Sequence, residues 1–116
     1  MNKLKAKTEV LQRLLGVAGI DVSTKVIGST VSIQLLIGDD QLTLRGRIPF
    51  GHDHKGAAYK EMVRGAKTYV HLVKPAIQTA TLSQLAGPFK KGDYWEGVVT
   101  DALATIKEDV LGTPPF

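Results

Sequence analysis

The chain has 116 residues, of which 43% are hydrophobic and 22% charged, and it contains no cysteine. This length and composition are typical of one compact domain, over residues 1–116, rather than of a disordered or fibrous protein. The lack of cysteine excludes disulfides, thiolate metal sites and cysteine nucleophiles, and it favours a cytoplasmic protein. No stretch approaches the roughly 20 apolar residues that a membrane-spanning helix needs, so we expect no membrane partner.

The net charge of +4 is unevenly distributed along the chain. Residues 1–91 contain 14 Lys and Arg against 6 Asp and Glu, whereas residues 92–116 contain one Lys and five acidic residues. A basic body is typical of proteins that bind a polyanion such as nucleic acid. Alternatively, the acidic end contacts the basic body, within one fold or between copies of the chain.

In chain order, the first expected element is an amphipathic helix over residues 4–17, ended by Gly16 and Gly19. A strand is expected over residues 22–27. Residues 31–37 and 42–48 then alternate apolar and polar side chains on either side of a Gly-Asp-Asp sequence. This pattern predicts a β-hairpin, because Gly and Asp tolerate the backbone angles of tight turns.

Helices are expected in the second half of the chain. One covers residues 55–74 and ends or kinks near Pro75, because proline lacks the amide donor and clashes with the preceding turn. A short helix over residues 76–86 is stopped by Gly87 and Pro88, and a final acidic helix begins at a capping box of Asp93 and Glu96. The expected fold is α+β: an N-terminal helix, a three-stranded antiparallel sheet, and two to three C-terminal helices packed on one sheet face.

The clearest functional signal is a basic stripe on the helix over residues 55–74. Lys60, Arg64, Lys67, His71 and Lys74 recur every three or four residues, which places them on one helix face. On a straight helix they would extend over about 20 Å, enough to follow phosphates along a groove. Glu61 and the lack of aromatic residues on this face argue against base stacking, so binding would be to the backbone and would weaken with salt.

Other cations extend the candidate surface. Lys55 begins the same helix, and Arg45 and Arg47 lie on the polar face of the predicted hairpin. The candidate nucleic-acid-binding residues are therefore Lys60, Arg64, Lys67, Lys74, Arg45, Arg47 and Lys55. The alternative is that both the helix face and the sheet face are simply solvated.

The loop over residues 51–56 contains the side chains His52, Asp53 and His54, which are of the type that binds divalent metals. No His-Glu-x-x-His pattern accompanies them, and the alternative is a polar cap for the following helix. The loop also lacks the Lys and Ser/Thr that a P-loop carries after its second glycine. We therefore expect a non-enzymatic protein with no metal site and no cofactor.

The order helix, three strands, helix, with Lys55 at the start of the second helix, resembles double-stranded-RNA-binding domains. The resemblance covers residues 3–74 and concerns the order of elements only. That family opens its second helix with a cluster of lysines and alanines, whereas this chain has Lys55-Gly56-Ala57-Ala58-Tyr59-Lys60 with one lysine at the start. The family's Gly-Pro-x-His loop between the first two strands is also missing.

These patterns predict a small nucleic-acid-binding accessory protein. The alternative is a structural or assembly subunit, of phage or mobile-element type, that oligomerises through its basic body and acidic C-terminal helix. The two hypotheses differ in the role they give to the charge asymmetry.

Overall fold

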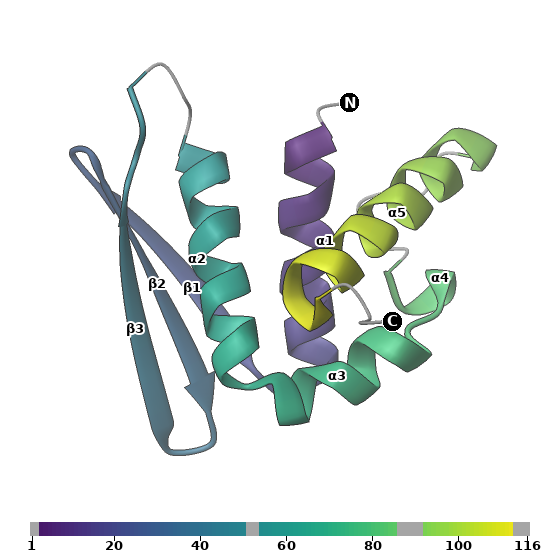
Figure 1. The fold of residues 1–116 in the computed structure, drawn as a ribbon, viewed down its shortest axis with the longest axis horizontal. Helices are drawn as coiled ribbons and strands as arrows, with labels where there is room; N and C mark the ends of the chain where they lie inside the picture. The colour runs from purple at the N-terminus through teal and green to yellow at the C-terminus, as the bar shows by residue number, and fades with distance from the viewer. Residues whose placement is uncertain (1–2, 51–53, 86–91, 113–116) are drawn as a thin grey trace.

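The computed structural model describes residues 3–50, 54–85 and 92–112 (Figure 1). Helix α1 (Lys3–Val17) precedes three strands, β1 (Asp21–Ile27), β2 (Thr30–Ile37) and β3 (Asp40–Arg47). Then follow α2 (His54–Thr68), α3 (Val70–Thr79), α4 (Leu82–Leu85) and α5 (Gly92–Ile106), which continues into the π-helical turn η2 (Lys107–Leu111). The expected α+β fold is confirmed. None of the described helices is long and apolar enough to cross a membrane.

The three strands form an antiparallel sheet in the order β1-β2-β3. Both connections are two-residue turns, and each begins with a glycine at positive φ, Gly28 at 59° and Gly38 at 57°. Glycine in this position is typical of type II′ turns, whose twist matches that of paired strands. The hairpin predicted around Gly38 is therefore present, and β1 and β3 form the two edges of the sheet.

One face of the sheet is apolar, and α2 packs on it over β2 and β3 (Figure 1). Ile33 and Leu35 of β2 are fully buried, and Leu44 of β3 is 8% exposed. The helix approaches closely at Gly65, where an added Cβ would overlap Leu35 and lie 2.9 Å from Cδ1 of Leu44. Helix α1 packs against α2, and α5 packs against α1, farther from the sheet.

The basic segment forms two helices rather than one. Helix α2 ends at Thr68, and α3 begins at Val70 and runs in a different direction (Figure 1). Between them, Tyr69 has φ −107° and ψ 29°, in the sparsely populated bridge region. Pro75 lies inside α3. The prediction that one helix reaches Pro75 is therefore wrong.

The position of the core explains the break between α2 and α3. The sheet lies beside α2, whereas α3 packs against α1 and η2. By turning at Tyr69, the chain buries Val73 and Ile77 of α3, which are 0% and 1% exposed. A straight continuation of α2 would carry these side chains past the end of α1.

The C-terminal part also differs in detail from the prediction. The helix expected over residues 76–86 is divided between α3 and α4, and the expected stop at Gly87 and Pro88 lies outside the described residues. Helix α5 is present, and its buried side includes Val99 and Ile106. The side chain of Asp93, the predicted N-cap, lies outside the part of the chain that the structure describes. Gly112, at φ 82°, ends η2 and donates its N–H to Glu108 O at 3.0 Å.

Candidate nucleic-acid interface

Three of the predicted cations lie together on the solvent side of α2. Lys60, Arg64 and Lys67 are exposed, whereas Met62 and Ala66 on the same helix are buried. At about 100° of rotation per residue, the three cations fall within about 60° of arc. They form one basic surface, which we call the α2 face.

A buried carboxylate holds Arg64 in place. The Arg64 guanidinium donates to Glu61 Oε1 at 3.0 Å and to Oε2 at 2.7 Å, and Glu61 is only 4% exposed. Glu61 lies directly over Gly46 of β3, where an added Cβ would come within 2.6 Å of Glu61 Oε1. Glu61 therefore positions Arg64 beside the edge of the sheet. The sequence did not indicate this role, because Glu61 falls within a charged stretch that is typical of a solvated face.

Arg45 and Arg47 lie on the opposite side of β3. Both side chains are exposed, and they flank Gly46, the position that faces α2. Because side chains alternate between the two faces of a strand, Arg45 and Arg47 project from the outer face of the sheet. Cations of the α2 face and of β3 therefore lie on the two sides of one free strand edge.

The free edge of β3 adds main-chain donors between these two groups. Ile37 and Asp40 close the two-residue turn, and such a pair is hydrogen-bonded. Bonded and non-bonded pairs alternate along an antiparallel ladder, so even-numbered residues of β3 bond to β2. The bond from Ile48 N–H to Ser29 O, at 2.8 Å, follows the same alternation. The N–H groups of Arg45 and Arg47 therefore face the open edge.

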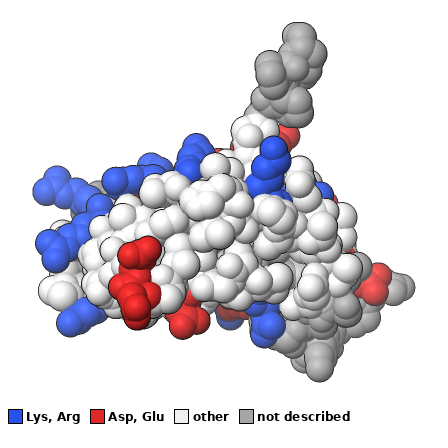
Figure 2. All heavy atoms as spheres, turned by 90° about the horizontal axis from the view of Figure 1, so that it is seen from below, with Lys and Arg blue, Asp and Glu red and all other residues white. Residues whose placement is uncertain are grey.

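Lys and Arg gather at the end of the molecule that contains the sheet and α2 (Figure 2). Within the described residues, Lys60, Lys67, Arg45 and Arg47 have no carboxylate partner. Acidic residues at this end include Asp39 and Asp40 of the β2–β3 turn, and other exposed acids lie on α5 and η2: Glu96, Asp101 and Glu108. The charge asymmetry of the sequence is therefore also an asymmetry in space.

Other predicted cations lie away from this surface. Lys55 is half-buried in the first turn of α2, and five residues of rotation place it about 140° around the helix from Lys60. Lys74 and His71 are exposed on α3. Because α3 runs in a different direction, the straight stripe of about 20 Å expected from helical spacing does not form.

The histidine-rich loop is only partly described. His54 is the first residue of α2 and is exposed, whereas His52 and Asp53 lie outside the described residues. In the part of the chain that the structure describes, no three His, Cys, Asp or Glu side chains come together as metal ligands.

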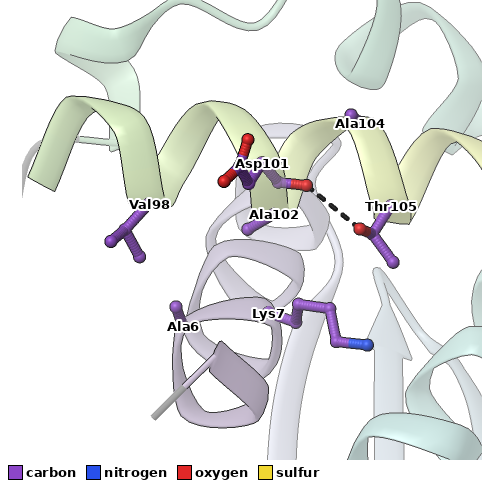
Figure 3. A pocket seen from close by; sticks show the side chains of 7 residues that line it. All are labelled: Ala6, Lys7, Val98, Asp101, Ala102, Ala104 and Thr105. Carbon is purple, nitrogen blue, oxygen red and sulfur yellow. Dashed lines mark hydrogen bonds between the residues drawn. The ribbon is translucent and has the colours of Figure 1, made fainter. Parts of the chain in front are cut away.

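A hollow of about 410 Å³ lies between α1 and α5 (Figure 3). The Thr105 hydroxyl at its wall donates to Asp101 O at 3.1 Å, within α5. The hollow is lined mainly by small and apolar side chains: Ala6, Lys7, Val98, Asp101, Ala102, Ala104 and Thr105. Its lining offers one cation and one carboxylate, without the convergent donors of an anion site.

Tyr59 connects three helical segments beside this hollow. Lys7 Nζ of α1 lies 4.7 Å from the centre of the Tyr59 ring, and the Tyr59 hydroxyl donates to Asp109 of η2. Burial, followed by the hydrogen bond and the negative charge of Asp109, raises the pKa of Tyr59 well above its usual range. We therefore interpret this cluster as a structural junction between α1, α2 and η2.

Comparison with protein-family models, curated proteins and solved structures finds no match for this chain. The order of elements noted for double-stranded-RNA-binding domains is present, as α1, the three strands and α2. This resemblance is limited to the order of the elements. The function is therefore argued from the geometry of the site.

Proposed function

We propose that this chain is a small non-enzymatic nucleic-acid-binding accessory protein that contacts phosphates around the edge of β3. The supporting observation is the placement of cations on both sides of one free strand edge, with main-chain N–H groups between them. We call this set the phosphate surface: Lys60, Arg64 and Lys67 of α2, and Arg45 and Arg47 of β3.

The chemistry of this surface suits a phosphate backbone. Arginine guanidinium groups and backbone N–H groups donate hydrogen bonds to phosphate oxygens, while lysines add positive charge. No exposed aromatic side chain lies on β3 or on the α2 face within the described residues, although Phe50, three residues beyond the end of β3, is fully exposed. The five cations themselves provide no platform for stacking bases, and we expect binding that is mainly to phosphates.

Salt dependence is the characteristic property of such binding. Each phosphate that a cation neutralises releases counterions, so the affinity falls as the salt concentration rises. If all five cations contact duplex phosphates, the logarithm of the binding constant changes with the logarithm of the salt concentration by a slope of about −4.5. A weaker slope would indicate fewer contacts.

The experiment is fluorescence-anisotropy binding to labelled duplex and single-stranded DNA and RNA at two salt concentrations. The test variant is Lys60→Glu/Lys67→Glu, which leaves Arg64 in place because removing it would leave the buried Glu61 without its partner. The control is Arg13→Glu/Lys107→Glu, which makes the same change in charge at exposed positions on α1 and η2.

We expect the test variant to bind about tenfold or more weakly than wild type, and the control to bind within a few-fold of it. Differences among the four probes would identify the preferred nucleic acid. An absence of wild-type binding at low salt would overturn the proposal. Equal losses in the two variants would also contradict it, because they would assign binding to net charge rather than to this surface.

A second candidate function is supported by the separation of charges in space. The exposed acids Glu96 and Asp101 lie on α5, which packs against α1 farther from the sheet, whereas Glu108 lies on η2, which packs against α2 and α3. One copy can therefore place its α5 end against the basic surface of another. Such a head-to-tail contact generates rings or filaments, as in a phage-type assembly subunit. It predicts oligomers that form without nucleic acid, that dissociate with salt, and that Lys60→Glu/Lys67→Glu abolishes. Light scattering after nuclease treatment tests it.

A further inference from the structure

The other edge of the sheet, β1, is mostly uncovered. Helix α2 packs on β2 and β3, and six of the seven residues of β1 are exposed. Val26, on the apolar face of the sheet, is 44% exposed, and Ile27 is 63% exposed. Apolar side chains at an open strand edge are unfavourable in water and favour contact with another surface.

Edge strands normally carry features that prevent pairing with other chains, such as proline, a bulge or several charges. Strand β1 contains no proline, its seven residues pair one to one with β2 without a bulge, and its two charged residues, Asp21 and Lys25, are of opposite sign. It therefore presents a straight and nearly neutral edge for another strand.

The backbone groups that face this open edge follow from the β1–β2 turn. Ile27 and Thr30 close that two-residue turn and are therefore hydrogen-bonded to each other. By the alternation of an antiparallel ladder, odd-numbered residues of β1 bond to β2. The N–H and C=O groups of Val22, Thr24 and Val26 therefore point outward.

We propose that two copies of this chain pair through β1, antiparallel and about a two-fold axis at Thr24. In this arrangement Val22 lies opposite the partner's Val26, and Thr24 lies opposite the partner's Thr24. All the outward N–H and C=O groups of the strand then find partners, and apolar side chains pair on the inner face. Cross-strand pairs of this kind stabilise antiparallel sheets.

The register is set by the ends of the strand. A shift that centres the axis at Ser23 would place Ile20 opposite the partner's Val26. Ile20 is not part of the strand: it is 1% exposed, and its N–H donates to Leu15 O at 2.8 Å. Centring at Thr24 is therefore the register in which β1 is paired over its full length.

The charges of β1 balance in this register. Lys25 lies opposite the partner's Ser23 and is diagonal both to the partner's Asp21 and to the partner's Lys25, on the outer face of the sheet. Diagonal neighbours are about 7–8 Å apart, which a lysine side chain spans. The two-fold axis makes the contact between Lys25 and the partner's Asp21 twice, as expected for a self-complementary interface.

Pairing through β1 goes beyond the proposed function and does not depend on it. The two sheets would join into one of six strands with both β3 edges at its ends. Each copy would then keep its phosphate surface free. A nucleic acid that reached both would be bound with the added strength of two linked sites.

Disulfide trapping tests the two-fold axis directly, because the natural chain has no cysteine. The test variant is Thr24→Cys, whose Cα atoms would lie about 5.5 Å apart in a hydrogen-bonded pair, within the range for a disulfide. The control is Thr43→Cys, an exposed threonine on the other edge strand. We expect mild oxidation to convert Thr24→Cys to a covalent dimer and to leave Thr43→Cys mainly monomeric. Equal rates of cross-linking would overturn the proposal.

Light scattering over a range of protein concentrations gives a second test. We expect wild type to approach twice the chain mass of 12.5 kDa, and Thr24→Lys, which places two like charges opposite each other, to remain at the single mass. Thr43→Lys is the control and should dimerise as wild type does. A wild type that stays at the single mass would contradict the proposal, as would equal masses for the two variants. Circular dichroism checks that both variants fold.

Discussion

The two edges of the sheet present the same backbone groups but different side chains. Both β1 and β3 leave every second N–H and C=O group open to another strand or ligand. Around β3 lie Arg45, Arg47 and the cations of α2, whereas β1 carries mainly apolar and hydroxyl side chains. We therefore propose that the side chains around a free edge determine its partner: a phosphate backbone at β3, and a second copy of the chain at β1.

The largest expected change in stability comes from a pair of core substitutions that compares how well β3 and β1 are covered. Leu44→Ala on β3 should lower the free energy of unfolding by about 3 kcal/mol, because it leaves a cavity under α2. Val26→Ala on β1 should cost less than about 1 kcal/mol in the monomer, since Val26 is 44% exposed and Leu44 is 8% exposed. Urea unfolding of dilute protein measures both. Similar costs would show that β1 is covered as well as β3 is.

The next largest change in stability is expected where α2 approaches β2 and β3 closely. Gly65→Ala should destabilise the protein by about 2 kcal/mol, because its Cβ would overlap the fully buried Leu35. Gly97→Ala is the matched control, since no atom lies within 4 Å of an added Cβ on that glycine of α5. It should be neutral, or stabilising by up to about 1 kcal/mol. Thermal unfolding compares them, and a harmless Gly65→Ala would contradict the close contact.

A smaller effect concerns the link between α2 and the edge of β3. Arg64→Ala should cost about 1–2 kcal/mol, because the buried Glu61 carboxylate loses its charged donor. Lys60→Ala, on the same face, should change stability by less than about 0.5 kcal/mol. Adding Glu61→Gln to Arg64→Ala should recover part of the loss. If Arg64→Ala and Lys60→Ala are equally mild, Glu61 does not anchor Arg64.

The smallest change in stability is expected at Tyr59, on the side of α2 that faces away from the β3 edge. Tyr59→Phe removes one hydrogen bond to Asp109 and should cost about 1 kcal/mol near neutral pH. Burial and Asp109 raise the folded-state pKa of Tyr59, so its contribution is complete below the ordinary tyrosine pKa of about 10. Above that pH the unfolded state loses a proton that the folded state keeps.

Wild type should therefore lose stability above about pH 10, by up to about 1.4 kcal/mol per pH unit from this residue. Tyr59→Phe should lack this part of the loss. Chemical denaturation at several pH values between neutral and strongly alkaline measures the difference. Parallel pH profiles for the two proteins would contradict the junction at Tyr59.

The fold was largely predictable because its signals are local. The alternation of residues 31–37 and 42–48, with glycine first in the turn, is sufficient to specify the hairpin. The break at Tyr69 was not predictable, because Thr68, Tyr69 and Val70 lower helix propensity only slightly and Pro75 offered a stronger signal. The break depends on where α1 lies, which is a property of tertiary packing.

The candidate site was only partly predictable. Helical spacing correctly placed Lys60, Arg64 and Lys67 on one face. It also joined Lys74 to them, because spacing alone cannot reveal that the helix changes direction. The role of Glu61 depends on its contact with Gly46, a residue on a different element. The exposure of β1 likewise follows from the position of α2 on the sheet.

Amide chemical shifts measured during a titration with the preferred nucleic acid test the difference between the two edges most directly. We expect shifts at Thr43, Arg45 and Arg47 of β3 and along the α2 face, which decrease as salt is added. The amides of Val22, Thr24 and Val26 should respond to dilution of the protein and, at a concentration where the dimer is complete, not to nucleic acid. Shifts induced by nucleic acid at β1 but not at β3 would contradict the assignment of the phosphate surface.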